Sequence, residues 1–489
     1  MSISFNSVPP ANRTPFTFVE FDNAGANQGP TLKKFRAVLF GQKIAGGTAV
    51  ANTLLRITSV AQARLAAGAG SMLAHMFELW FKANPLTEVF MMPLSDDGAG
   101  VAATSTVTFT GTATAAGSIS LYVAGRVIRV GVSLADTAAQ IATALAAAIN
   151  ANPDYPVTAA AVGAVVTLTY RHKGAVGNGV DVRLNYYPDS EALPAGITAV
   201  IVAMANGVTD PSLVAAISNL GETQFDIIGH PYTGAASLTA LENELADRWG
   251  PIRQNDGRAV TFKSDTLNNL ATMGATRNSP HSLVFGGEKF PSAPYEIAAS
   301  LAGVIAYYLN IDPARPLQTL PLPGILPPAD GDRFLMAENN TLLFSGIATL
   351  FVDDGGVVRI QRAITTYRKS PLGADDPSYL DITTLATLSY LRYDFRTFWM
   401  NKYPRHKLAN DGTRFGAGQA VMTPKIGKAE AISKFRDWEE LGLVEGFDQF
   451  KNSLIVERNI SDPNRLDFFM APDLMNALVV TGVKIGFLL

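Results

Sequence analysis

The chain contains no cysteine in its 489 residues. Disulfides, thiolate zinc sites and cysteine nucleophiles are therefore excluded, while the redox compartment stays open. The five histidines are scattered along the chain without the spacing of a metal site. We expect neither a bound metal nor a cofactor.

Charged residues are also scarce, at 17% of the chain, and the formal net charge is −3. Neutralising nucleic-acid phosphates takes concentrated Lys and Arg. The most basic stretch, Arg359 to Lys369, is preceded by Asp353 and Asp354, so a solvated strand face explains it best. We expect no nucleic-acid partner, and a surface that is polar but uncharged or is buried against other subunits.

No apolar run reaches the roughly 18 residues that a membrane span requires. The nearest, residues 65–81, is interrupted by His75 and Glu78. The first thirteen residues lack the basic and apolar regions of a secretory signal. We therefore expect a soluble chain that is made in the cytoplasm and has no membrane partner.

The length predicts two or three domains rather than one core. Strand-like and helical segments alternate over residues 21–97 and again over residues 208–312. This alternation predicts an α/β core domain in which helices cover a mainly parallel sheet. Ser71 is expected to cap a helix that ends at Asn84.

Residues 98–207 have a different texture, rich in Ala, Thr, Val and Gly and poor in charge. Two expected hairpins turn at Ala124-Gly125 and at Gly163, with a helix between them. The pattern predicts a β-rich domain that is inserted into the core domain, lies on the outside and folds independently.

A Pro-rich connector over residues 313–333 leads to a third unit, residues 334–477. Its pattern predicts an α+β C-terminal domain with a hairpin turning at Asp353 to Gly356 and two amphipathic helices. The fold class is therefore α/β and α+β, in several domains.

Both ends of the chain look extended. Residues 1–20 contain three prolines, which disfavour helix, and several aromatic residues. Residues 478–489 alternate apolar positions with a period of two, which is typical of a strand that needs a sheet to join. These ends are predicted to be arms.

The best enzyme-like feature is the Gly-rich loop from Gly41 to Thr48, which follows an expected strand. A phosphate-binding loop needs a lysine where Gly47 stands. His230 follows another strand, but no partner residue is evident. An α/β enzyme or nucleotide-binding protein using this loop remains the alternative.

Several stretches resemble one family, the tail sheath proteins of Mu-like contractile-tailed bacteriophages. They are "SISFNSVPPANRTPFTFVEFDN", the stretch from "RAVLFGQKIAGG" to "SMLAHM", "DPARPLQTLPLPGI", and the long run from Leu342 to Gly412. The likeness covers most of the chain and is least clear over residues 98–207.

The resemblance implies a structural subunit without enzymatic activity. Such a subunit forms stacked hexameric rings around a tail tube and contracts to drive the tube through the host envelope for genome ejection. The implied partners are further copies of the chain, the tail tube protein, and the baseplate and tail terminator proteins. The implied location is the tail of the virion, after assembly in the cytoplasm of a bacterial host.

The resemblance also assigns roles to residues. Both arms would donate strands to neighbouring subunits, and the C-terminal domain would lie nearest the tube. Within that domain, the basic residues of one expected helix are the leading candidate for tube contact, and a solvated helix face is the alternative. The N-terminal arm residues are Phe5, Phe16 and Phe18; those of the C-terminal arm are Val479, Val483, Ile485, Phe487 and Leu489; the tube-facing candidates are Lys425, Lys428, Lys434 and Arg436.

Overall fold

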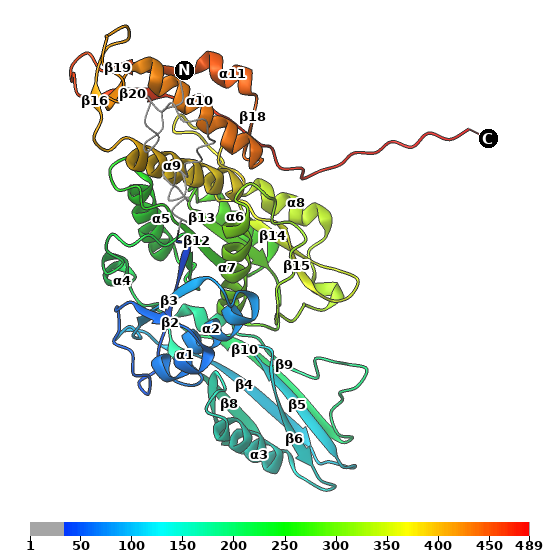
Figure 1. The fold of residues 1–489 in the computed structure, drawn as a ribbon. Helices are drawn as coiled ribbons and strands as arrows, with labels where there is room; N and C mark the ends of the chain where they lie inside the picture. Colours follow the sequence, from blue (N-terminus) through cyan, green and yellow to red (C-terminus); the bar gives the residue numbers. More distant parts are fainter. Residues whose placement is uncertain (1–33, 489) are drawn as a thin grey trace, which may run out of the picture.

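A computed structural model describes residues 34–488, and its centre is an eight-stranded sheet in the order β15-β14-β13-β12-β11-β1-β3-β2 (Figure 1). All neighbours from β14 to β3 pair in parallel, whereas the edge strands β15 and β2 are antiparallel to theirs. The predicted mainly parallel sheet is confirmed. Its strands are β1 (Arg36–Gln42), β2 (Leu55–Ile57), β3 (Glu88–Leu94), β11 (Ile227–Gly229), β12 (Arg258–Ser264), β13 (Ser282–Gly287), β14 (Ala348–Val352) and β15 (Val358–Arg362).

Helices cover both faces of this sheet, because its strands are apolar on both sides. In β1, Ala37 and Leu39 pack in the cluster that contains α2 and α7, whereas Val38 and Phe40 pack with α4 and α5. Strands buried on both faces are typical of parallel sheets. The core helices are α1 (Val60–Ala67), α2 (Met72–Ala83), α4 (Val214–Ser218), α5 (Ala235–Trp249), α6 (Leu267–Ala275), α7 (Pro294–Ile311) and α8 (Met336–Phe344), with a 3₁₀ turn at Asp330–Asp332.

The helix α2 begins where the sequence predicts. The Ser71 hydroxyl accepts a hydrogen bond from the Ala74 N–H at 3.1 Å, and Asn84 is the C-terminal cap. This side-chain acceptor satisfies one of the unpaired donors of the first turn. The helix lies buried between the sheet and α7.

The hairpin β14–β15 lies in a different domain from the one that the sequence pattern predicts. The sequence pattern places it in the C-terminal domain, but β14 pairs with β13 and extends the core sheet. A hairpin pattern specifies its own turn and pairing, and contains no information on which sheet its outer edge joins. The remaining predicted boundaries stay predictions.

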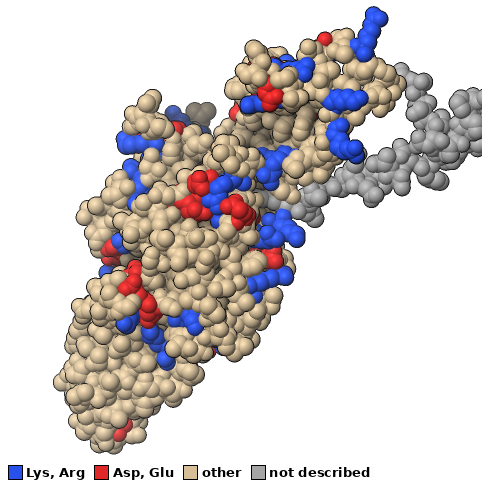
Figure 2. Space-filling model, turned by 90° about the vertical axis from the view of Figure 1, so that its left-hand side faces the viewer, with Lys and Arg blue, Asp and Glu red and all other residues tan. Residues whose placement is uncertain are grey.

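Residues between β3 and α4 form two separate sheets, in the orders β10-β4-β8-β7 and β6-β5-β9, at the lower end of the molecule in Figure 1. We call residues 98–207 the inserted domain. Both predicted hairpins are present, as β5–β6 and β7–β8, and Thr137 caps the predicted helix. The elements are β4 (Ala102–Gly111), β5 (Gly117–Val123), β6 (Arg126–Val132), α3 (Ala138–Ala151), β7 (Val157–Val162), β8 (Val165–Lys173), a 3₁₀ helix (Ala175–Gly179), β9 (Val182–Leu184) and β10 (Ile197–Ala205). Its surface is almost uncharged on the side shown in Figure 2.

The inserted domain joins the core through polar contacts that are buried or partly buried. Arg126 on β6 donates to Glu296 on α7 at 2.8 Å and to Glu78 on α2 at 3.1 Å. The Nε2 atom of His172 on β8 accepts the N–H of Met72, the first residue of α2, at 2.9 Å. We call these contacts the seam. In these contacts, residues of the core helices α2 and α7 form hydrogen bonds with side chains of the inserted domain.

Beyond β15 the chain forms a helical layer at the other end of the molecule (Figure 1). The two predicted helices are present as α9 and α10, and α10 begins at Pro424 after the cap Thr423. Phe435, Trp438 and Phe450 are the centre of its core. The elements are α9 (Ile382–Lys402), β16 (Lys407–Leu408), β17 (Val421–Met422), α10 (Pro424–Glu440), β18 (Val444–Glu445), α11 (Phe447–Ser453), β19 (Ile455–Arg458), β20 (Leu466–Phe469) and β21 (Asp473–Leu474).

Candidate assembly surfaces

The Gly41–Thr48 loop is bonded to the end of α1. The N–H groups of Ile44 and Thr48 donate to carbonyls of Ala67 and Leu65 at 3.0 and 3.1 Å. A Cβ on Gly47 would lie 2.4 Å from the Ala66 carbonyl oxygen, which explains the glycine there. A phosphate loop presents its amides at a helix N-terminus, whereas these amides are taken up by the C-terminal turn of a helix. The geometry does not favour nucleotide binding at this loop.

His230, the other enzyme-like residue, is sealed inside the core. Its exposed fraction is 0%, and neither ring nitrogen has a hydrogen-bond partner within residues 34–488. Burial lowers the pKa of His230 to about 4, so the ring is neutral near pH 7. A substrate cannot reach it without unfolding, and a structural role fits the residue best.

Within residues 34–488, no three His, Asp or Glu side chains gather as a metal site. In the same part of the chain, every helix is too short or too polar to span a membrane.

The C-terminal arm is extended and solvent-exposed. No strand is assigned from Met475 to Leu488 in the described chain, and the arm leaves the body in Figure 1. Val483, Ile485 and Phe487 are 77%, 85% and 81% exposed. Leu489, together with Phe5, Phe16 and Phe18 of the N-terminal arm, lies outside the described residues.

The root of this arm is held on the core. The Gln318 side chain donates to the Leu478 carbonyl at 3.1 Å, and Val479 is half-buried in a niche beside Arg362 and Ala363. The predicted arm residue Val479 therefore contacts its own subunit, and the segment clear of the body begins after it. Neither Gln318 nor this niche carries a signal in the sequence.

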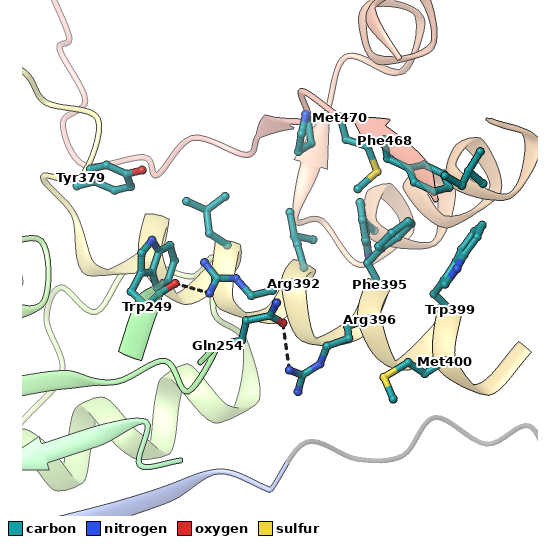
Figure 3. Close-up of a pocket in the computed structure, with 15 residues that line it drawn as sticks. Trp249, Gln254, Tyr379, Arg392, Phe395, Arg396, Trp399, Met400, Phe468 and Met470 are labelled. Atoms are coloured by element: carbon teal, nitrogen blue, oxygen red, sulfur yellow. Dashed lines mark hydrogen bonds between the residues drawn. The ribbon is translucent and has the colours of Figure 1, made fainter. Parts of the chain in front are cut away.

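An apolar groove of about 730 Å³ lies between α9, the β19–β20 hairpin and the end of α5 (Figure 3). Phe395 and Trp399 of α9 stack on one another, and Phe468 of β20 packs edge-on against both. On the core side, Arg392 lies over the Trp249 ring at 4.2 Å and donates to the Trp249 carbonyl at 2.7 Å. The sequence analysis did not identify this groove.

The four tube-facing candidates do not share one face of α10. Lys425 and Arg436 are exposed, and Lys428 is half-exposed at the border of the buried stripe. Lys434 points the other way, toward α9, and pairs with Asp394 at 2.8 Å with its side chain 14% exposed. Arg436 lies over the Phe447 ring at 3.2 Å and pairs with Glu439 at 2.5 Å. Lys425 and Lys428 therefore have the side chains most available to a partner.

The family is identified by comparison with a curated relative. The tail sheath protein of the Mu-like prophage FluMu of Haemophilus influenzae is 42% identical to this chain over 489 residues, covering 100% of both. The chain belongs to the phage tail sheath family.

Three family models match successive parts of the sheath subunit. They describe the phage tail sheath β-sandwich domain at residues 98–198, the central domain at residues 206–366 and the C-terminal domain at residues 374–484. The first of these spans most of the inserted domain. The central model includes β14–β15, in agreement with the pairing of this hairpin in the core sheet.

Solved sheath structures are more distant. The sheath tail protein of Desulfitobacterium hafniense is 12% identical with a TM-score of 0.49, covering 94% of this chain and 100% of that one. The contracted sheath complex of an extracellular contractile injection system, PVC, is 9% identical with a TM-score of 0.46, covering 98% of each chain. By its membership of the tail sheath family, the protein is a structural component of a contractile phage tail.

Proposed function

We propose that the sheath subunit polymerises as stacked hexameric rings around a tail tube, and that contraction of this polymer drives the tube through the host envelope for genome ejection. Assembly takes place in the bacterial cytoplasm, and the ends of the polymer meet the baseplate and tail terminator proteins. No catalytic step is required of the subunit. The proposal rests on the family and on one observation, the exposed apolar arm.

The arm suits strand donation because its free backbone and apolar residues need a partner. Net hydrogen-bond contributions of about 0.5–1.5 kcal/mol each do not offset backbone ordering at roughly 1–2 kcal/mol per residue. Burial of large apolar side chains, at about 1.5–3 kcal/mol each, has to supply the rest. Val483, Ile485 and Phe487 can do so on one face of the strand. Many such links then hold a lattice through multivalency.

Removal of residues 481–489 tests this role. The truncated subunit keeps its root at Leu478 and Val479, so we expect it to stay folded and soluble but to form no tubes in negative-stain micrographs. Phe487→Asp should have the same effect, because the substitution would bury a carboxylate between the donated strand and the neighbouring subunit, which is unfavourable. Lys484→Ala, on the alternate face, is the matched control and should assemble normally. Tubes of truncated subunits that survive dilution would refute strand donation by this arm.

The N-terminal arm is proposed to act in the same way, through Phe5, Phe16 and Phe18. Its support is the sequence pattern and the family resemblance. Removal of residues 1–18 should reproduce the loss of tubes seen with the C-terminal truncation, in the same micrographs.

The proposed tube-facing surface is the exposed side of α10, with Lys425 and Lys428 as its principal cations and Arg436 beside them. Lys434 pairs with Asp394 on α9 and is therefore assigned a structural role between the two helices rather than a contact with the tube. Co-sedimentation with the tube protein after charge reversal at Lys425 and Lys428 tests this surface.

A further inference from the structure

The outward face of α8 is apolar, unlike the outward faces of the neighbouring helices. Met336 and Phe344 are 85% and 78% exposed, and Leu335, just before the helix, is 70% exposed. On α5 and α6, both within the described chain, no large apolar side chain is exposed. An uncovered Met–Phe–Leu group of this kind is typical of a contact site.

No charge interrupts this face. Its other exposed residues are Ala337, Asn340 and Thr341. The single acidic residue of the helix, Glu338, folds back and accepts the Leu335 N–H at 2.7 Å. The inward residue Leu342 is fully buried beside Leu270 and Val284. The core packing of α8 is therefore made by its inward residues, and the exposed outward side chains take no part in that packing.

The C-terminal arm indicates which molecule covers the α8 face. The root of the arm is bonded to Gln318 and lies beside Arg362, the last residue of β15. Residues 319–322 in turn bond along the outer edge of β15. Both α8 and the arm thus belong to the β14–β15 edge of the sheet, and in Figure 1 they lie toward the same side. A neighbour reached by the arm comes from that side.

We propose that Leu335, Met336 and Phe344 form a docking patch for a second copy of this chain, the copy that receives the C-terminal arm. This inference rests on the proposed polymerisation. The arm provides the tether, and the patch fixes the neighbour against the core. Such a patch is too small to hold a stable dimer of about 800 Å² per partner by itself, so it acts only when the tether has raised the local concentration.

The double variant Met336→Glu with Phe344→Lys tests the patch. The acidic residue stands at the N-terminus of α8 and the basic residue at its C-terminus, so both suit the helix dipole and the net charge is unchanged. We expect an unaltered melting temperature and at least a tenfold higher critical concentration for tube formation, measured by sedimentation.

Leu86→Lys is the matched control. Leu86 is also 78% exposed, but it precedes β3, near the opposite edge of the sheet. This variant should polymerise as the unaltered chain does. Equal loss in both variants, or normal assembly of the double variant, would overturn the assignment of a patch to α8. Failure of the unaltered chain to form tubes would instead refute the proposed polymerisation itself.

Discussion

The inserted domain and the C-terminal helical layer attach to the same core in different ways. The inserted domain is joined by the seam, in which Arg126 donates hydrogen bonds to α2 and α7 and His172 accepts the N–H of Met72 at the start of α2. The C-terminal layer is joined through α9, where Arg258 donates to the Leu385 carbonyl at 2.8 Å and Arg392 donates to the Trp249 carbonyl at 2.7 Å and pairs with Asp256 at 3.0 Å. The apolar groove opens beside these contacts, and Arg396 donates to Gln254 across it at 3.1 Å.

This difference teaches which boundary can bend. Breaking a buried ion pair leaves an uncompensated charge, so the seam resists separation. The groove is mostly apolar, but Arg392 and Arg396 bond to the core across it, so only the part of α9 beyond Arg396 can separate from the core without breaking these bonds. We therefore expect the inserted domain to move with the core as one body, and relative motion to occur beyond Arg396 on α9. Independent folding of the inserted domain stays a prediction.

The largest effect should come from Arg126→Met. Glu296 is 4% exposed, and burial already raises its pKa, against the opposing charge of Arg126. Without the arginine, Glu296 is a buried carboxylate with no counter-ion, and we expect a loss of about 3 kcal/mol in the free energy of unfolding. Urea denaturation of the full chain measures it.

The control for that variant is Arg129→Met on the same strand. Arg129 is exposed and pairs with Glu191 at 3.0 Å; without it, Glu191 keeps the Tyr122 hydroxyl and the Tyr187 N–H as donors, so the removal should change stability little. Equal stability of both variants would show that the seam does not hold the inserted domain, and the comparison would fail.

A smaller, pH-dependent effect is expected from His75 on α2, whose Nε2 atom lies 2.9 Å from the Asp154 carbonyl oxygen of the inserted domain. Burial, and next the charge of Arg126, lower the pKa of His75 well below 6.5. The unfolded chain takes up a proton below about pH 6.5 and the folded chain does not, so acidification favours unfolding. The contribution is present above this pH and is lost progressively below it.

His75→Gln should therefore flatten the acid slope of stability by about one proton, or ~1.4 kcal/mol per pH unit. Denaturation at a series of pH values from 7 to 5 measures this slope. His406→Gln is the control, because His406 is exposed. An unchanged slope in the His75 variant would mean that this ring is protonated in the folded state.

The smallest effect on stability concerns α10. Lys425→Glu with Lys428→Glu should leave the free energy of unfolding within about 0.5 kcal/mol and should weaken co-sedimentation with the tube protein. Lys434→Ala should have the opposite effects. It should lower the free energy of unfolding by about 1 kcal/mol, because the ion pair with Asp394 is lost, and it should leave binding to the tube unchanged. Unchanged co-sedimentation of the double variant would contradict the proposed tube-facing side.

Local patterns predicted the elements well. The cap Ser71 and the turn at Ala124-Gly125 each depend on residues a few positions apart, and the structure confirms the helix and the hairpin. The opposite orientations of Lys425 and Lys434 were also readable, because nine positions equal about two and a half helical turns. That signal was overlooked.

Long-range contacts could not be predicted. Arg126 and Glu296 are 170 positions apart, and nothing in either neighbourhood indicates the pairing. The same holds for the anchoring of Leu478 by Gln318, 160 positions away. Alternation at the C-terminus predicted a strand, yet a strand exists only with a partner, and within residues 34–488 none is provided. Strand donation by this arm stays a prediction.

The bond from Met72 to His172 also sets an order of events during synthesis. The ribosome completes α2 about a hundred residues before the histidine that closes its first turn, since the two positions are 100 apart. Nascent domains generally fold as units from the N-terminus, and Ser71 caps α2 locally, but the bond from Met72 forms only after the strand β8 has emerged. Contacts of such separation slow folding. Because β1 pairs with β11 and α2 packs against α7, the first segment of a sheath subunit stays uncovered until the chain that follows the inserted domain has also been translated.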